Sequence, residues 1–282
     1  MKIRRAQRTQ RTLRVLPAAL ALSVCLAVTG CGAGSAGGEA GDGGDSASSN
    51  DGGDDAAPET GDQTFQVLAA ASLTDVFDDL ADTFQDQHEG VEVEASYGSS
   101  TDLAEQAADG APGDVLATAD ETSMQVAEDA GVTGDVTTFA TNTLVIVVPP
   151  GNPGGVSTLA DLAGVDWVRC ADEVPCGRVA QAVLQDNDVT AEPVSLEEDV
   201  RATLEKVESG EAEAGLVYAS DAVAAGDDVE SIEIPGSEAQ ETSYFVAPLT
   251  QSEDADLAAD WAALLTSEDG RRVLEDAGFT LP

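Results

Sequence analysis

Apolar and polar residues follow two different periods along most of this 282-residue chain. Short runs at 65–71 and 144–148 are apolar almost throughout, which is typical of buried strands. Between such runs the apolar residues return at helical spacing, as in 72–85, where they fall on one face. Further strands are predicted at 91–97, 114–118, 167–169, 214–218, 229–234 and 244–247. Further helices are predicted from 99 through Leu103 and Ala107, from the end of the strand 114–118 to about Gly131, and at 157–162, 178–184, 199–207, 220–225, 255–265 and 267–277. This alternation predicts an α/β architecture with parallel sheets covered on both faces.

The first 30 residues differ from this pattern. A basic head is followed by an apolar stretch at 15–28, which predicts a signal peptide too short to span a bilayer comfortably. The stretch ends in Thr29-Gly30-Cys31, which resembles the lipobox of bacterial lipoproteins. That resemblance implies lipidation at Cys31 and a protein anchored at the outer face of the cell membrane. An ordinary signal peptide with an incidental cysteine is the alternative.

Residues 31–63 contain Gly, Ser, Asp and Glu but no aromatic and no large aliphatic residue. Such a segment cannot bury enough apolar surface to offset its conformational entropy, so we expect a disordered tether. It would hold a folded domain of roughly 220 residues near the membrane at high effective concentration.

Charge is very unevenly distributed. The chain has 54 acidic and 12 basic residues, and six of the basic ones lie in the first 14 positions. The remainder is therefore strongly anionic, which argues against nucleic-acid binding because that requires a cationic surface. Such acidity is typical of a well-solvated surface and fits a salty habitat.

Two of the four cysteines, Cys170 and Cys176, lie in the expected folded part. Outside the cytoplasm, two cysteines this close are expected to form a disulfide. A zinc site is not expected, because the chain has a single histidine.

Catalysis has little support in the sequence. His88, the single histidine, lies in a polar segment at a predicted helix end, where a solvated surface residue is expected. A serine triad needs a histidine base, and no nucleophile elbow, P-loop or dinucleotide-binding glycine pattern occurs. We therefore expect a protein that is not an enzyme.

Two serine-containing turns, 69–74 and 97–101, each join a strand to the start of a helix. Free N–H groups at helix N-termini, together with serine hydroxyls, can bind an anion. Both turns follow the carboxyl ends of strands, where open α/β sheets place ligands. The alternative is two ordinary helix caps, with Ser72 and Asp75 forming a capping box.

At these residues the chain resembles the bacterial periplasmic molybdate-binding proteins, from about Phe65 to Phe279. The stretches that carry the resemblance are 69–74, 98–104, 110–115, 141–147, 173–177, 198–201 and 215–222. It implies a type II periplasmic-binding-protein fold, with two α/β lobes around a ligand cleft. Lobe one would comprise 64–142 and 246–282, and lobe two 143–245.

The resemblance also implies the ligand and its site. The ligand would be molybdenum or tungsten as the oxyanion, molybdate or tungstate, and no cofactor is implied. The residues that match the family's ligand set are Ser72, Ser100, Cys176, Val200 and Tyr218. The serines would donate from hydroxyl and backbone, Cys176 and Val200 from backbone N–H alone, and Tyr218 from its hydroxyl. Cys176 departs from the family, whose members often have alanine there, but only its amide is needed.

The partners implied by the resemblance are the membrane permease and the ATPase of an ABC importer, with the bilayer as anchor. A monomer is expected. The same fold binding sulfate or another small anion is the nearest alternative. A surface hydrolase that depends on His88, and a purely structural surface lipoprotein, are more distant ones.

Overall fold

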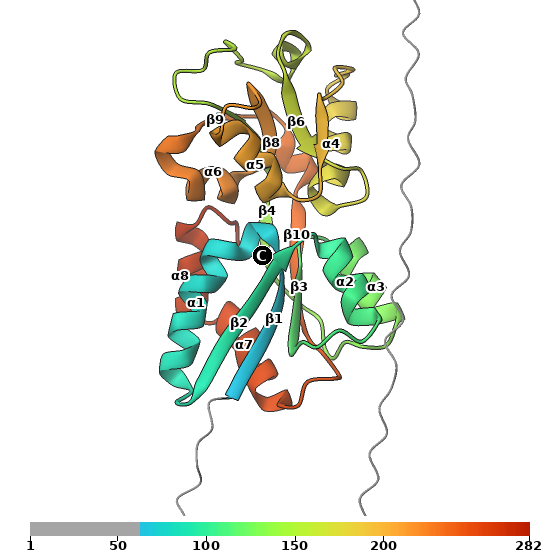
Figure 1. The fold of residues 1–282 in the computed structure, drawn as a ribbon, viewed down its shortest axis with the longest axis vertical. Helices are drawn as coiled ribbons and strands as arrows, with labels where there is room; N and C mark the ends of the chain where they lie inside the picture. The colour runs from blue at the N-terminus through green and yellow to red at the C-terminus, as the bar shows by residue number, and fades with distance from the viewer. Residues whose placement is uncertain (1–62) are drawn as a thin grey trace, which may run out of the picture. The chain divides into compact units, whose positions relative to one another are not determined.

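A computed structural model of the chain describes residues 63–282, which belong to one compact unit (Figure 1). The expected signal peptide, the lipidation site Cys31 and the expected tether lie outside the described residues. The described part contains two five-stranded sheets, each with helices packed on it. The two sheets lie one above the other along the long axis in Figure 1.

The first sheet has the strand order β2-β1-β3-β10-β4. Strand β1 pairs in parallel with β2 and β3, whereas β10 is antiparallel to both β3 and β4. Its strands are β1 Gln63–Ala70, β2 Val91–Gly98, β3 Val115–Thr118, β4 Thr137–Asn142 and β10 Thr242–Pro248.

The second sheet has the strand order β7-β6-β8-β5-β9. Strand β6 is parallel to β7 and β8, and β5 is antiparallel to β8 and β9. Its strands are β5 Leu144–Val148, β6 Trp167–Cys170, β7 Ser195–Glu197, β8 Ala214–Tyr218 and β9 Glu230–Glu233.

Helices follow most strands, so that several helices begin at the carboxyl end of a strand. The α-helices are α1 Thr74–Gln87, α2 Ser100–Ala108, α3 Glu121–Asp129, α4 Pro175–Asp186, α5 Val200–Glu208, α6 Ala219–Ala225, α7 Ala255–Thr266 and α8 Glu268–Asp276. Short 3₁₀ segments are η1 Ala71–Leu73, η2 Leu159–Gly164, η3 Gly226–Asp228 and η4 Ser237–Gln240.

We use "lobe one" for the first sheet with its helices and "lobe two" for the second. The chain leaves lobe one after Asn142 and returns at Thr242, and these two residues are register partners on adjacent strands. Both crossings therefore lie side by side. The expected return boundary at residue 246 falls inside β10, which belongs to lobe one over its whole length.

The expectation of parallel sheets was wrong in part, because each sheet is mixed. The first strand after each crossing between the lobes, β5 in lobe two and β10 in lobe one, is antiparallel to both of its neighbours. Strands β4 and β7 were not predicted: β7 has only three residues and is partly exposed, so it lacks a strong apolar signal. The helix predicted at 157–162 is the 3₁₀ segment η2.

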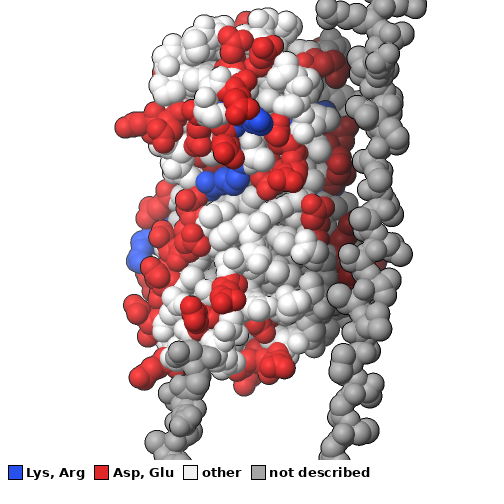
Figure 2. Space-filling view, in the orientation of Figure 1, with Lys and Arg blue, Asp and Glu red and all other residues white. Residues whose placement is uncertain are grey.

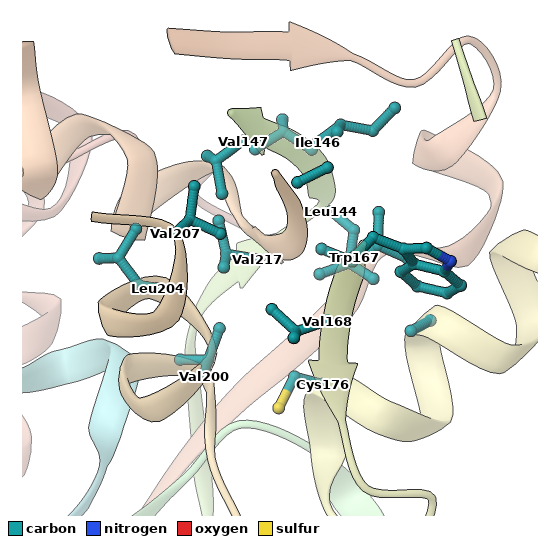
Figure 3. Packing of buried hydrophobic residues seen from close by; sticks show 14 of the residues in the cluster. Leu144, Ile146, Val147, Trp167, Val168, Cys176, Val200, Leu204, Val207 and Val217 are labelled. Atoms are coloured by element: carbon teal, nitrogen blue, oxygen red, sulfur yellow. The ribbon is translucent and has the colours of Figure 1, made fainter. Parts of the chain in front are cut away.

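Each lobe has its own apolar core. In lobe one, Trp261 of α7 packs against Phe65, Phe77 and Phe84, with ring centroids 5.2–5.8 Å apart. In lobe two, aliphatic side chains of β5, β8 and α5 pack together with Trp167, and Cys176 and Val200 lie at the edge of this cluster (Figure 3). Such burial, at about 25 cal/mol per Å² of apolar surface, is the main force that holds each lobe. Both expected site residues are thus supported by a packed core.

On the face shown in Figure 2, acidic side chains are spread over both lobes and far outnumber the basic ones. His88 is less solvated than expected, because its ring packs on Phe84 with centroids 4.2 Å apart. Among the helices of the described part, none combines the length and the apolar character that crossing a membrane requires.

Candidate functional site

One small cavity lies between the lobes. The space in it that is open to the centre of a water-sized sphere is about 20 Å³. Lobe one contributes Ala70, Ala71, Ser72, Gly98, Ser99, Ser100 and Ala119, and lobe two contributes Val174, Pro175, Cys176, Asp199, Val200 and Tyr218. The structure therefore brings all five predicted site residues to one place, and each of them is buried.

The cavity is surrounded by the N-termini of helical segments. Segment η1 and helix α2 begin here from lobe one, and α4 and α5 begin here from lobe two. The N–H groups of a helix's first turn have no acceptor within the helix, and they carry its partial positive charge. Four first turns aimed at one space make a site that favours a small anion.

Ser72 does not cap a helix, which corrects the expected capping box with Asp75. The N-cap of α1 is Leu73, with no side-chain cap bond. The Ser72 hydroxyl instead forms a hydrogen bond of 2.8 Å with the hydroxyl of Tyr244 on β10. If Tyr244 donates, the Ser72 proton is free to point into the cavity. Tyr244 was not identified from the sequence, because its contact with Ser72 spans 172 positions.

Ser100 is the first residue of α2, whose N-cap is Ser99. The Ser100 hydroxyl oxygen accepts a 3.0 Å hydrogen bond from the backbone N–H of Ala119. Its own proton is not used by that bond and can be donated to a ligand. Ser100 thus keeps a free hydroxyl proton, and Ser72 does so when Tyr244 is the donor in their hydrogen bond.

The Cys176 turn is constrained from two sides. A disulfide joins Cys170, at the end of β6, to Cys176, with Cα atoms 5.7 Å apart. Gly177 packs so closely on the preceding loop that an added Cβ would lie 1.6 Å from the carbonyl oxygen of Ala171. Pro175 occupies the first helical position, where its missing N–H leaves no bond unmade. The next free backbone donor of α4 is then the N–H of Cys176.

Val200 opens α5 behind its N-cap Asp199, whose carboxylate accepts from the N–H of Ala202 at 2.9 Å. That bond leaves the Val200 N–H free for a ligand. Asp199 also lines the cavity, although it is not among the site residues predicted from the sequence. Its position was visible in the sequence as an Asp directly before a helix.

Tyr218 provides the clearest sign of a missing partner. Its hydroxyl is fully buried, and within residues 63–282 it has no hydrogen-bond partner. Burial, with nearby Tyr244 and acidic side chains, raises the pKa of Tyr218 well above its usual value, so its proton is retained at neutral pH. A buried hydroxyl without a partner costs about 1–3 kcal/mol. A ligand that accepts its proton would remove this cost.

The charges around the cavity are arranged in two layers. None of its lining residues is Lys, Arg or His, so the inner layer offers only neutral donors and apolar groups apart from Asp199. Behind Tyr218, the buried carboxylate of Asp221 accepts from the Tyr218 N–H at 3.2 Å and lies 3.0 Å from Arg201. Across residues 63–282, no cluster of His, Cys, Asp and Glu is suited to a bare metal ion. The neutral donors at the helix N-termini are of the kind that favours a small anion.

Comparison with known proteins agrees with this geometry. Residues 65–280 match the family of bacterial extracellular solute-binding proteins. The molybdate-binding protein ModA of Mycobacterium tuberculosis is 37% identical over 230 residues, which is 80% of this chain and 88% of that protein. The chain belongs to this family. Its members bind and carry solutes, so the expectation that the protein is not an enzyme is confirmed.

Solved structures confirm the predicted two-lobed type II fold. The periplasmic molybdate-binding protein of Azotobacter vinelandii matches with a TM-score of 0.70 at 22% identity, over 77% of this chain and 99% of that one. The sulfate-binding protein SubI of Mycobacterium tuberculosis matches with a TM-score of 0.69 at 19% identity, over 77% and 86%. At these identities the matches establish the fold of the family alone.

Replacing Gly177 by Ala should destabilise the protein. The new methyl group would collide with the backbone of Ala171, which cannot move freely beside the disulfide. We expect a loss of about 3 kcal/mol or more, a fall in Tm of roughly 6–12 °C. Gly98→Ala is the matched control, because nothing lies within 4 Å of its added Cβ. Equal melting temperatures for the two variants would show that the tight approach is not needed.

The buried carboxylate of Asp221 should make stability depend on pH. Burial raises its pKa from 3.8 to about 7, although Arg201 and the Tyr218 N–H oppose this shift. Between these two values the folded protein holds a proton that the unfolded chain has lost, so this residue's contribution to stability falls as the pH rises. The Tm of Asp221→Asn minus that of the wild type should therefore increase from pH 4 to pH 7 and level off above it. A difference that stays constant over this range would contradict the assignment.

Proposed function

We propose that this protein captures molybdate or tungstate outside the cytoplasm and delivers it to an ABC importer. The anion would lie in the cavity between the lobes. It would accept hydrogen bonds from the hydroxyls and N–H groups of Ser72 and Ser100, the N–H groups of Cys176 and Val200, and the hydroxyl of Tyr218. These residues match the family's ligand set by resemblance, and only the backbone N–H is needed at Cys176, where the side chain departs from the family.

The observation that carries the proposal is the Tyr218 hydroxyl, which is buried in the cavity wall and has no hydrogen-bond partner among residues 63–282. The backbone N–H groups at four helix N-termini and the hydroxyls of two serines lie around the same cavity. Together with the Tyr218 hydroxyl they form a set of hydrogen-bond donors to which a small anion could be the acceptor. Charge-assisted hydrogen bonds contribute roughly 1.5–3 kcal/mol each. Several such bonds, less the cost of ordering, support a binding free energy of about −8 to −11 kcal/mol.

The donor set also favours one class of anion. Molybdate, tungstate and sulfate carry no proton at neutral pH and need donors only. Protonated phosphate would have to donate a hydrogen bond as well. Asp199 is the one carboxylate in the cavity wall, and it already accepts from Ala202. Sulfate remains the second candidate, because the chain shares its fold with a sulfate-binding protein.

The partners in this proposal are the permease and the ATPase of the importer. The protein would act as a monomer held at the outer face of the cell membrane by a lipid on Cys31. The lipobox-like end of the N-terminal segment and the acidic, aliphatic-poor residues that follow it support this arrangement. Closure of the two lobes over the anion would signal to the permease that the protein is loaded.

Calorimetric titration of the purified protein with molybdate, tungstate, sulfate and phosphate tests the proposal. We expect tight one-to-one binding of the first two and weak or absent binding of the others. If none of the four anions binds, the helix N-termini at the cavity do not form an anion site. Preference for sulfate would establish the alternative.

The variant Tyr218→Phe isolates the decisive hydroxyl. It removes one charge-assisted bond, so molybdate binding should weaken roughly 10- to 150-fold, which corresponds to about 1.5–3 kcal/mol. The Tm without anion should not fall, because the hydroxyl has no hydrogen-bond partner in the described part of the chain. Tyr97→Phe is the matched control: it removes a hydroxyl bonded to Asp78 outside the cavity wall and should bind molybdate normally. If Tyr218→Phe binds molybdate as tightly as the wild type, the Tyr218 hydroxyl does not contact the anion.

Reduction of the disulfide should weaken anion binding, because Cys176 would lose the link that fixes its N–H. The measurement is titration with molybdate before and after treatment with a reductant, with thiol labelling to verify that the bond has opened. Unchanged affinity after verified reduction would show that packing at Gly177 alone is sufficient to hold the turn.

A further inference from the structure

Two arginines of lobe two cross the boundary between the lobes. Arg178 lies in the first turn of α4 and Arg201 in the first turn of α5, the two helices that present Cys176 and Val200 to the cavity. Each arginine forms an ion pair with a carboxylate of lobe one, and neither lines the cavity. Their ion pairs can form only when the lobes are closed.

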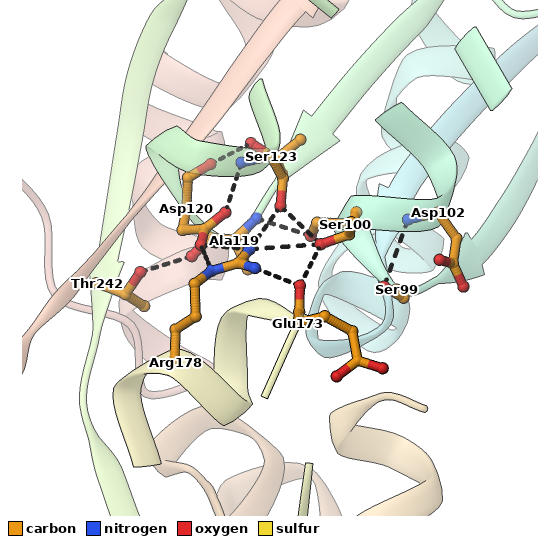
Figure 4. A network of polar contacts seen from close by, with 11 residues as sticks. Ser99, Ser100, Asp102, Ala119, Asp120, Ser123, Glu173, Arg178 and Thr242 are labelled. Atoms are coloured by element: carbon orange, nitrogen blue, oxygen red, sulfur yellow. Dashed lines mark hydrogen bonds and ion pairs between the residues drawn. The ribbon is translucent and has the colours of Figure 1, made fainter. Parts of the chain in front are cut away.

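The Arg178 contacts form a network across the boundary (Figure 4). Its guanidinium donates to the Asp120 carboxylate at 2.7 Å and to the Ser123 hydroxyl at 3.0 Å, both in lobe one. It also donates to the carbonyl of Glu173 in its own lobe. The Thr101 hydroxyl of lobe one donates to the same carbonyl at 2.9 Å. The guanidinium and Asp120 are partly buried, so solvent screens this pair less than an exposed one.

Arg201 makes the equivalent connection from α5. One nitrogen contacts the carboxylate of Asp75 in lobe one, and another lies 3.0 Å from the buried carboxylate of Asp221 in lobe two. Asp75 is three positions after Ser72, and Asp221 holds the backbone of Tyr218. The ion pair thus joins segments that carry ligand donors in both lobes.

The scarcity of basic residues makes these pairs more important than in an average protein. Both lobes are strongly acidic, so they repel each other as they close. The basic residues of lobe one are Arg271 and Arg272, and those of lobe two are Arg169, Arg178, Arg201 and Lys206. Half of the cations in lobe two therefore lie where the lobes meet.

We propose that Arg178 with Asp120, and Arg201 with Asp75, are closure latches: positioning residues that hold the lobes shut over the bound anion without touching it. The latches set how long the anion is retained. This inference rests on the proposed function, because it assumes an anion between the lobes. It adds residues outside the ligand set that determine the rate of release.

Release of radiolabelled molybdate into an excess of unlabelled molybdate tests the first latch. The variants are Arg178→Gln, Asp120→Asn and the double variant of the purified protein. Asp120 caps α3, and Asn caps a helix equally well, so this substitution removes the charge and keeps the cap. We expect each single variant to release molybdate about tenfold faster, and the double variant to be no faster than the singles.

Arg272→Gln is the control for net charge. It removes one positive charge from an exposed pair within lobe one and should leave the release rate unchanged. Wild-type rates in Arg178→Gln and Asp120→Asn would overturn the latch, and so would additive effects in the double variant. If the wild type itself retains no molybdate, the proposed function fails instead, so the two failures are distinguishable.

The second latch is tested with Asp75→Asn, which leaves the Arg201–Asp221 pair intact. Because the Asp75 side chain is more exposed, 57% against 14% for Asp120, we expect a smaller acceleration of release, about threefold. Small-angle X-ray scattering of the molybdate-bound proteins provides a second readout. Asp75→Asn combined with Asp120→Asn should show a more open average conformation than the wild type. An unchanged scattering profile together with unchanged release would exclude both latches.

Discussion

The structure depends on a set of backbone N–H groups that the helices themselves cannot satisfy. Four helical segments begin at the same small cavity, and the first turn of each leaves donors without acceptors. In the proposed function, one anion would satisfy donors from both lobes at once, so that binding would be coupled to closure of the lobes. The sheets, the disulfide and the glycine contact at Ala171 all serve to hold these turns in place.

The neutral donors that line the cavity and the charged side chains around it lie in different layers. The cavity wall carries no cation, and its donors are dipoles fixed by backbone geometry. Arginines lie one layer farther out, where they bridge the lobes and offset the repulsion between two acidic surfaces. In the proposed function, an anion in the centre would be recognised by the number and direction of these donors, whereas the outer ion pairs would respond to salt. The ionic medium would then change retention of the anion without changing which anion fits.

Much of the fold could be predicted from periodicity, because the long amphipathic helices and the continuous apolar strands give strong local signals. Strands β4 and β7 lacked such signals, and the mixed strand directions depend on where the chain returns between lobes. The five predicted ligand positions came from the family resemblance, and local patterns alone left Ser72 as a helix-cap candidate. Tyr244, Arg178 and Arg201 could not be identified from the sequence, because their partners are distant along the chain and their role exists only in the folded contact.

The adjacent crossings at Asn142 and Thr242 have a consequence for biosynthesis. Lobe two is one continuous insertion, so its sheet has all its strands before β10 is made. Lobe one must wait, because β10 lies between β3 and β4 and connects them. Until that strand arrives, β3 and β4 present unpaired edges, which favour aggregation. The many carboxylates are usually considered for their effect on the folded surface. By electrostatic repulsion they would also prevent an incomplete lobe one from associating with other chains before β10 is synthesised.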